Sequence, residues 1–151
     1  MDTINQSLRH DAGSREVLNE AASQATDKDL KDILPYGFGI HHAGMNRIDR
    51  TDVEDLFARG AIQVLVASRD VCWELTSTAH LVVVMGTQYF EGREHRYVDY
   101  PLSEALQMFG KSLRPSKAGS SRGVLMVPQV KRDYYRKFLN EALPVESHLH
   151  N

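Results

Sequence analysis

The chain has 151 residues, of which 42% are hydrophobic and 25% are charged, as in an ordinary globular domain. Its 18 lysines and arginines and 20 aspartates and glutamates give a formal net charge of -2. This balance excludes a strongly basic nucleic-acid-binding tail but not a local basic surface. The single cysteine, Cys72, excludes an intramolecular disulfide and a multi-cysteine zinc site. The longest apolar run, Leu81–Met85, is too short to span a membrane, and no apolar leader follows Met1, so we expect a soluble protein of a reducing compartment.

Hydrophobic periodicity predicts helices that alternate with strands along the chain. Ser14 and Thr26 are the predicted N-caps of the first two helices, Gly60 takes the C′ position after the third, and Pro101 stands at N1 of the fourth. The helices are expected over 14–22, 27–34, 47–59, 101–109 and 129–141. The strands are expected over 37–43, 62–67, 81–85 and 123–127. The last three of these strands are nearly continuous runs of Val, Leu, Ile and Met, which is typical of a parallel sheet with helices on its faces. The predicted class is therefore α/β.

A polar, basic loop over 111–122 separates the fourth helix from the last strand. Lys111 and Arg114 stand three residues apart and could converge on a phosphate. The alternative is a solvated loop whose cations complement the end of the preceding helix. Ser68, after a buried strand, could likewise hold a phosphate or simply form a turn. No G-x-x-x-x-G-K-[ST] loop occurs, so the chain holds no self-sufficient nucleoside triphosphatase site.

His41 and His42 are adjacent on a predicted strand and therefore point to opposite faces, so they cannot bind one metal ion together. We expect one packed and one polar histidine, with contact to a polyanion or to another domain as the alternative. No metal-binding residues are predicted. Cys72, beside Trp73, is expected to be a small packed side chain and not a nucleophile.

Several segments together resemble the second RecA-like domain of the Ski-type superfamily-two RNA helicases, in particular the spliceosomal members that carry two helicase cassettes in tandem. The segments that carry the resemblance are 39–45 (GIHHAGM), 53–57 (VEDLF), 62–67 (IQVLVA), 107–115 (QMFGKSLRP) and 143–147 (LPVES). The resemblance implies an incomplete RecA-like helicase C-terminal domain, with a parallel sheet flanked by helices. It implies a helical lead-in over 1–35, the RecA-like domain over 36–142 without its first strand, and the start of a winged-helix connection over 143–151.

The resemblance also implies two sets of site residues. Residues 107–115 correspond to the family motif Q-x-x-G-R-A-G-R-P, with Lys111 in place of the first arginine and Leu113 in place of the second glycine. Arg114 is therefore expected to serve as the catalytic arginine finger. The expected nucleotide-binding residues are Gln107, Gly110, Lys111 and Arg114. The expected RNA-binding residues are His42, Gly44, Arg47 and Ser68.

The two halves of the chain resemble different cassettes. Residues 1 to about 66 resemble the active cassette, whereas residues from about 67 onward resemble the degenerate one, so a joined or recombinant fragment is our hypothesis. Glu74 replaces a glycine of the family, and its negative charge is expected to repel both triphosphate and RNA backbone.

The function implied is that of a fragment of an ATP-dependent RNA helicase of pre-mRNA splicing in the nucleus, which contributes one wall of the ATP cleft and part of the RNA track. In the parent, ATP and magnesium would be bound mainly by the missing first RecA-like domain, so the isolated chain is expected to have no cofactor and no ATP turnover. The expected partners are RNA, the missing RecA-like and winged-helix domains and spliceosomal proteins, with no membrane. One alternative is a non-catalytic, degenerate module that docks proteins; another is a small α/β enzyme that uses the histidine pair.

Overall fold

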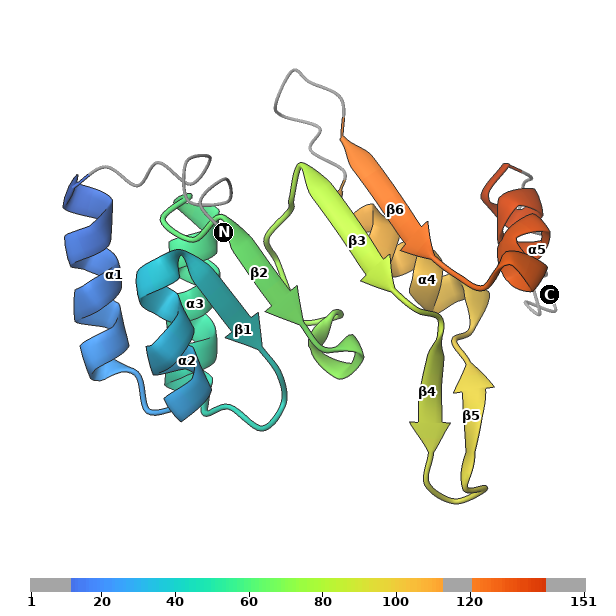
Figure 1. Cartoon of the computed structure of the whole chain (residues 1–151), viewed down its shortest axis with the longest axis horizontal. Helices are drawn as coiled ribbons and strands as arrows, with labels where there is room; N and C mark the ends of the chain where they lie inside the picture. The colour runs from blue at the N-terminus through green and yellow to red at the C-terminus, as the bar shows by residue number, and fades with distance from the viewer. Residues whose placement is uncertain (1–11, 113–120, 141–151) are drawn as a thin grey trace, which may run out of the picture. The chain divides into compact units, whose positions relative to one another are not determined.

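The computed structural model of the chain describes residues 12–112 and 121–140. The chain divides between Thr78 and Ala79 into two compact units, residues 1–78 and 79–151, and each is described by itself (Figure 1). Within the described residues, no helix is long and apolar enough to cross a membrane.

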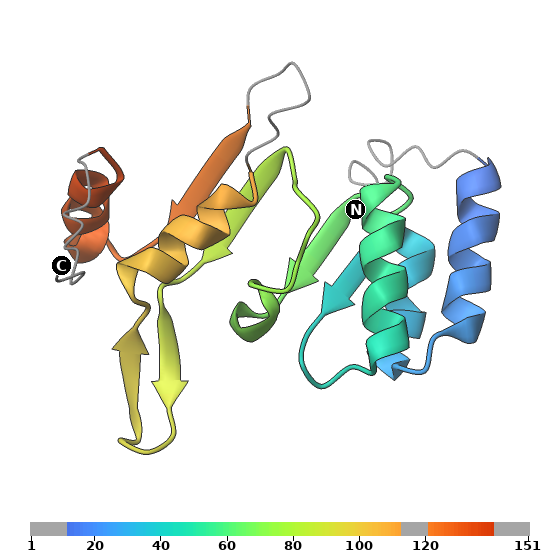
Figure 2. The same ribbon diagram turned by 180° about the vertical axis from the view of Figure 1, so that it is seen from behind.

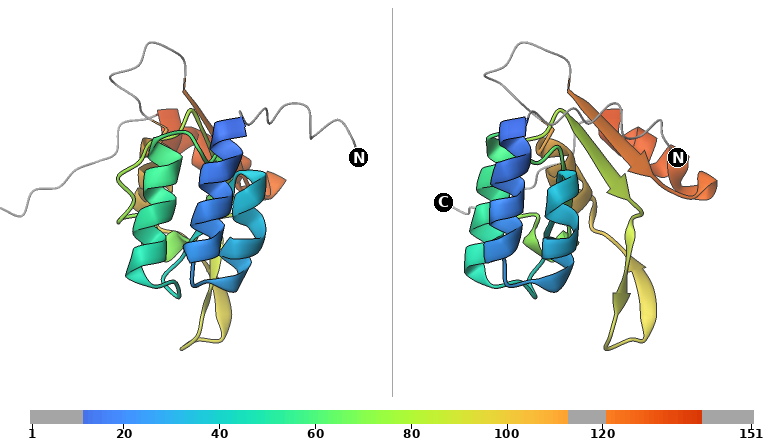
Figure 3. Two further views of the ribbon diagram at one scale, coloured as in Figure 1. Left: turned by 90° about the vertical axis from the view of Figure 1, so that its left-hand side faces the viewer. Right: turned by 60° about the vertical axis from the view of Figure 1, so that its left-hand side comes forward.

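Three helices and a pair of parallel strands make up the described part of the first unit. Figure 3 shows the three helices running beside one another. In chain order the elements are α1 (Ala12–Gln24), α2 (Lys28–Ile33), the 3-10 turn η1 (Leu34–Tyr36), β1 (Phe38–His41), α3 (Arg47–Ala58), β2 (Val64–Ala67) and the 3-10 turn η2 (Arg69–Val71). β1 pairs with β2 in parallel, from Phe38 opposite Val64 to His41 opposite Ala67.

The core of this unit joins the helices to the strand pair. A Cβ atom added at Gly39 would lie 3.0 Å from Cγ1 of Val53, so β1 approaches α3 as closely as a glycine allows. The buried residues of the core are Leu18, Ala25, Leu30, Leu34, Met45, Val53, Leu56 and Ile62.

Helix boundaries differ from the predictions at three positions and agree at a fourth. Ser14 lies inside α1 and is not its N-cap. Asp27, not Thr26, caps α2, because the Asp27 carboxylate accepts a hydrogen bond from the Leu30 amide at 2.9 Å. Pro101 is the N-cap of the fourth helix and not its first helical residue. Gly60 follows α3 with φ of +78°, as the C′ prediction requires.

The second unit contains a parallel pair, an antiparallel hairpin and two helices. Its elements are β3 (Leu81–Met85), β4 (Gln88–Glu91), β5 (Arg96–Asp99), α4 (Leu102–Gly110), β6 (Arg122–Met126) and α5 (Gln129–Asn140). β3 pairs with β6 in parallel and β4 with β5 antiparallel. Figure 2 shows α4 lying along one face of β3 and β6. Gly123 permits this packing, since a Cβ atom there would lie 2.8 Å from Cε1 of Phe109.

The predicted α/β class, with parallel strands and helices against them, is confirmed. Within the described residues, the strands of the first unit form one two-stranded sheet and those of the second unit form two. The β4–β5 hairpin is an addition that the sequence analysis did not predict.

Candidate functional site

Two of the predicted RNA-binding residues lie side by side at the carboxyl ends of β1 and β2. The parallel register sets His41 opposite Ala67, so His42 and Ser68 are the first residues after the two strands and lie next to each other. The Ser68 amide donates a hydrogen bond to the His41 carbonyl oxygen at 3.0 Å, which fixes the two chain segments to each other. The carboxyl edge of a parallel strand pair is where α/β folds place ligands.

The third predicted residue, Gly44, makes room for the ring of His42. A Cβ atom at Gly44 would lie 3.1 Å from Nδ1 and 3.2 Å from Cε1 of the His42 imidazole. The Met45 amide donates to the His42 carbonyl oxygen at 3.1 Å and closes the turn, with the Met45 side chain buried. On its other side, Nε2 of His42 lies 4.0 Å from Oδ2 of Asp27. The glycine thus lets the half-buried imidazole fold over the loop between β1 and α3.

The fourth predicted residue, Arg47, is the first residue of α3 and is exposed. Its position is set by the N-cap Asn46, whose side-chain oxygen accepts a hydrogen bond from the Asp49 amide at 2.7 Å. The loop from β1 to α3 carries His42 and Gly44, α3 begins with Arg47, and Ser68 follows the end of β2.

A buried carboxylate that the sequence analysis missed anchors this loop. The side chain of Asp49 accepts hydrogen bonds from the amides of Thr26 and Asp27, at 3.0 and 2.9 Å, and from the Asn46 side-chain amide at 3.2 Å. Asp49 is only 3% exposed. It therefore ties the first turn of α3 to the start of α2. No local signal identifies it, because its backbone partners lie 22 and 23 residues earlier in the chain.

The histidine pair divides as predicted into one packed and one polar side chain. His41 is 3% exposed, and its Nδ1 has no hydrogen-bond partner within the described residues, whereas His42 is half-buried. Burial lowers the pKa of the His41 imidazole, with the positive charge of Arg50 acting in the same direction and the carboxylate of Glu54 opposing it. The described residues hold no group of three or more His, Cys, Asp or Glu side chains that could bind a metal ion.

Two side chains of α3 hold the segment after η2. Nη1 of Arg50 donates to Oε2 of Glu74 at 2.9 Å. One turn later, Oε1 of Glu54 accepts hydrogen bonds from the Thr76 amide at 2.5 Å, the Thr76 hydroxyl at 2.6 Å and the Ser77 amide at 3.0 Å. Burial raises the pKa of the Glu54 carboxyl. These hydrogen bonds together lower the pKa by more than burial raises it, so the pKa lies below the ordinary value. We call these contacts of Arg50 and Glu54 the α3 clamp.

The predicted nucleotide-binding residues that the structure describes lie at the end of α4. Gln107 and Gly110 belong to the last turn of the helix, and Lys111 is its C-cap. Oε1 of Gln107 is buried and has no hydrogen-bond partner among the described residues. An unpaired buried acceptor of this kind, one turn from a cation, is compatible with a ligand that offers hydroxyl donors and phosphate oxygens. Arg114 lies outside the described residues.

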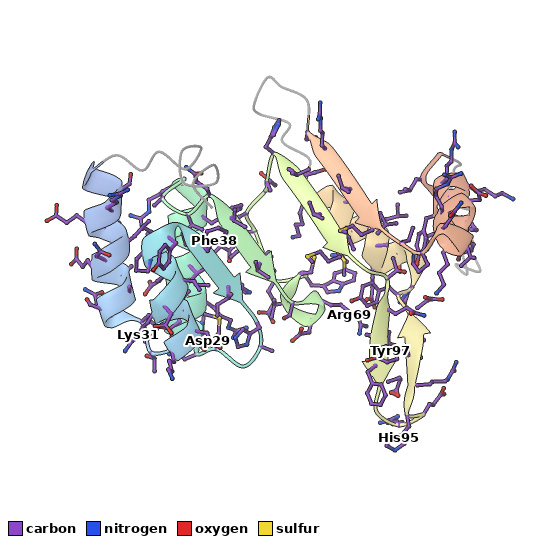
Figure 4. The ribbon with its side chains drawn as sticks, in the orientation of Figure 1. Asp29, Lys31, Phe38, Arg69, His95 and Tyr97 are labelled. Carbon is purple, nitrogen blue, oxygen red and sulfur yellow. The ribbon has the colours of Figure 1, made fainter. Side chains whose placement is uncertain are left out.

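The β4–β5 hairpin exposes an aromatic pair that the sequence analysis missed. Phe90 and Tyr97 face each other across the register with ring centroids 5.5 Å apart, and their side chains are 54% and 68% exposed. Tyr97 and His95, near the hairpin tip, are labelled in Figure 4. The available signal was a pair of four-residue runs with aromatic or β-branched residues, joined by a connection that contains Gly92.

No protein-family model matches the chain. Many relatives match it, and three that match most of it follow. The DExH-box ATP-dependent RNA helicase DExH14 of Arabidopsis thaliana is 46% identical over 136 residues, which is 90% of this chain. The U5 small nuclear ribonucleoprotein 200 kDa helicase of Homo sapiens is 49% identical over 124 residues, or 82% of the chain. The pre-mRNA-splicing factor brr2 of Schizosaccharomyces pombe is 42% identical over 146 residues, or 97% of the chain.

The chain spans only 6–7% of the length of these relatives. Identity of 42–49% over most of the chain nevertheless leaves no ambiguity about descent, and the parallel strand pairs fit an incomplete RecA-like domain. The chain therefore belongs to the family of RNA helicases that includes the U5 small nuclear ribonucleoprotein 200 kDa helicase, as the resemblance to Ski-type superfamily-two helicases predicts.

Proposed function

We propose that this chain contributes the RNA track and one wall of the nucleotide cleft to an ATP-dependent RNA helicase of pre-mRNA splicing. The names of its relatives specify an ATP-dependent RNA helicase, a U5 ribonucleoprotein helicase and a splicing factor. Such a parent would work in the nucleus, with RNA, spliceosomal proteins and the adjoining RecA-like and winged-helix domains as partners. The proposed boundaries of the RecA-like domain are 36–142.

The observation that carries the RNA-binding part is the pairing of His42 with Ser68 at the carboxyl ends of two parallel strands. An imidazole, a hydroxyl and the exposed cation of Arg47 are side chains that bind phosphate and ribose oxygens. Gly44 adds a stretch of backbone without a side chain of its own. The exposed rings of Phe90 and Tyr97 are a second candidate contact, because unpaired bases stack on aromatic side chains.

The nucleotide-binding part rests on Gln107, Gly110, Lys111 and Arg114. We propose that these residues face the triphosphate in the parent, where bound ATP and magnesium supply the phosphoryl group and neutralise its charge. Lys111 offers a point charge and not the bidentate fork of an arginine. Because the phosphate cradle would belong to another domain, we expect the isolated chain to hydrolyse no more ATP than its Arg114→Ala variant.

Fluorescence anisotropy with a short labelled oligouridylate tests the RNA-binding part on the 151-residue chain. We expect Arg47→Ala to weaken binding and to reduce the slope of log affinity against log salt by about 0.7, the value for one phosphate contact with a single strand. Arg59→Ala is the matched control, since Arg59 is also an exposed arginine of the same helix but lies at its opposite end, at the C-cap.

Equal losses of RNA affinity in Arg47→Ala and Arg59→Ala would show that affinity depends on the net charge of the chain. They would contradict a binding site at the carboxyl ends of β1 and β2. Absence of RNA binding by the unsubstituted chain at low salt would contradict the proposal for the isolated chain. His42→Ala and Ser68→Ala should each weaken binding in the same assay without lowering the thermal midpoint below that of Arg59→Ala.

A second candidate function, a module that docks proteins, is favoured by one observation. One face of the β3–β6 pair exposes apolar side chains; these are Leu81, Val83, Met85, Val124 and Met126, with exposures from 43% to 81%. A contiguous apolar face of this kind is typical of a surface covered by other protein. Other splicing proteins are the partners that this candidate implies.

A further inference from the structure

Glu74 is a carboxylate with most of its surface in solvent and one cationic partner. Its side chain is 63% exposed, and Oε2 accepts the 2.9 Å hydrogen bond from Nη1 of Arg50. The backbone beside it is fixed, because the Glu74 amide donates to the Val71 carbonyl oxygen and the following residues are held by Glu54. The carboxylate is therefore presented to Arg50 by a segment with little freedom to withdraw.

Arg50 lies close to the edge that carries the proposed RNA-binding residues. It stands one turn after Arg47 on α3, so the two side chains project from neighbouring positions of the helix. Its charge also acts on the imidazole of His41, the last residue of β1 before His42. The side chain of Arg50 is 25% exposed, and its Nε is buried without a hydrogen-bond partner within the described residues. Arg50 thus stands beside this edge, with its Nη1 engaged by Glu74.

An arginine fork binds a carboxylate and a phosphate with the same geometry. A carboxylate bonded to that fork therefore competes directly with an RNA phosphate for it. Glu54, one turn after Arg50 on α3, is engaged by Thr76 and Ser77, and the burial of His41 favours its neutral form. Glu74 is the carboxylate that bonds to the Arg50 guanidinium, so an RNA phosphate would have to displace it to bind there.

We propose that Arg50 is a further phosphate-binding residue of the RNA-contacting edge, and that Glu74 occupies it as an internal substitute for an RNA phosphate. The inference rests on the proposed function, since it assumes that RNA binds at the ends of β1 and β2. It differs from the expectation drawn from sequence, in which Glu74 acts only by repelling phosphate. In the structure the Glu74 carboxylate is paired with Arg50. Removing the charge of Glu74 therefore relieves repulsion and also frees the guanidinium of Arg50.

The test measures affinity for a short labelled oligouridylate across a range of salt concentrations. Glu74→Gln keeps the size of the side chain and removes its charge. We expect it to raise affinity about two- to fivefold at low salt, the scale of a partly exposed ion pair. The slope of log affinity against log salt should steepen by about 0.7, because one more phosphate is bound. The double variant Arg50→Met with Glu74→Gln should lose both gains.

Glu16→Gln is the matched control, because Glu16 is exposed on α1 and its loss changes the net charge by the same amount. Equal gains in Glu74→Gln and Glu16→Gln would overturn the inference, and so would a gain that survives in the double variant. Arg50→Met alone should leave the salt slope unchanged, since the guanidinium is already occupied; a shallower slope would contradict this. A gain seen with ATP as the ligand but not with the oligouridylate would also overturn the assignment to RNA.

These outcomes separate the inference from the proposed function. If the unsubstituted chain binds RNA through Arg47 but Glu74→Gln behaves like its control, only the role of Arg50 fails. If neither the unsubstituted chain nor Glu74→Gln binds RNA, the proposed RNA-binding function fails and the inference fails with it.

Discussion

The buried carboxylate of Asp49 should be the main polar determinant of stability in the first unit. Asp49→Ala removes the acceptor for the Thr26 and Asp27 amides, which bond to it at 3.0 and 2.9 Å. A buried N–H left without an acceptor costs about 1–3 kcal/mol. Because these bonds are only part-buried, we take the lower half of that range for each, and expect a total loss of about 2–4 kcal/mol. This is a large fraction of the roughly 5–15 kcal/mol that stabilises a typical domain.

Urea unfolding followed by far-ultraviolet circular dichroism and by fluorescence of Trp73, the single tryptophan, measures this loss. Asp52→Ala is the matched control, because Asp52 is an exposed aspartate of the same helix. We expect the control to change the free energy of unfolding by less than about 0.5 kcal/mol. Equal effects of the two substitutions would refute the reasoning, since they would show that the hydrogen bonds of Asp49 contribute nothing beyond helix propensity.

Two further predictions concern packing and pH. Gly123→Ala should destabilise the second unit by about 1–3 kcal/mol, because the added Cβ atom collides with the ring of Phe109. Gly92→Ala is the control, because no atom lies within 4 Å of its added Cβ. Thermal unfolding of both variants should show a smaller loss of stability for Gly92→Ala. Glu54, with its pKa below the ordinary 4.5, stabilises the fold above that value and loses this contribution as pH falls through the lowered pKa. Urea midpoints of the unsubstituted chain and of Glu54→Gln should therefore converge in acid; a constant difference at all pH values would contradict the role of the carboxylate.

The helices and parallel strands were predictable because their signals are local. The apolar faces of α1, α3 and α4 repeat at helical spacing, and the Val, Leu and Ile runs mark the strands β2, β3 and β6. The left-handed φ of Gly60 was also readable, since glycine tolerates that conformation best. The parallel direction of β1 and β2 was predicted, but the pairing and register that bring His42 beside Ser68 come from the structure.

The N-cap of α2 and the β4–β5 hairpin could not be read from the sequence in the same way. Thr26 and Asp27 are both competent N-caps; the structure uses Asp27, while the amides of both residues bond to Asp49, far along the chain. The hairpin strands lack the continuous Val, Leu and Ile runs that marked β2, β3 and β6, so their signal was weaker.

The α3 clamp was unpredictable because its partners are distant in sequence. Arg50 and Glu74 are 24 residues apart, and Glu54 and Thr76 are 22 apart, so no helical or strand period relates them. The charge of Glu74 could be predicted, but its pairing could not. The role of Arg114 stays a prediction, since that residue lies outside the described part of the chain.

The most direct test of the account is a nuclear magnetic resonance titration of the isotopically labelled chain with a short oligouridylate. Residue-resolved shifts report where RNA binds without any substitution. We predict the largest amide shift changes at His42, Gly44, Arg47 and Ser68, the residues at the carboxyl ends of β1 and β2. Shift changes confined to other residues, or none at RNA concentrations that saturate the anisotropy signal, would contradict the assignment of this edge as the RNA-binding surface.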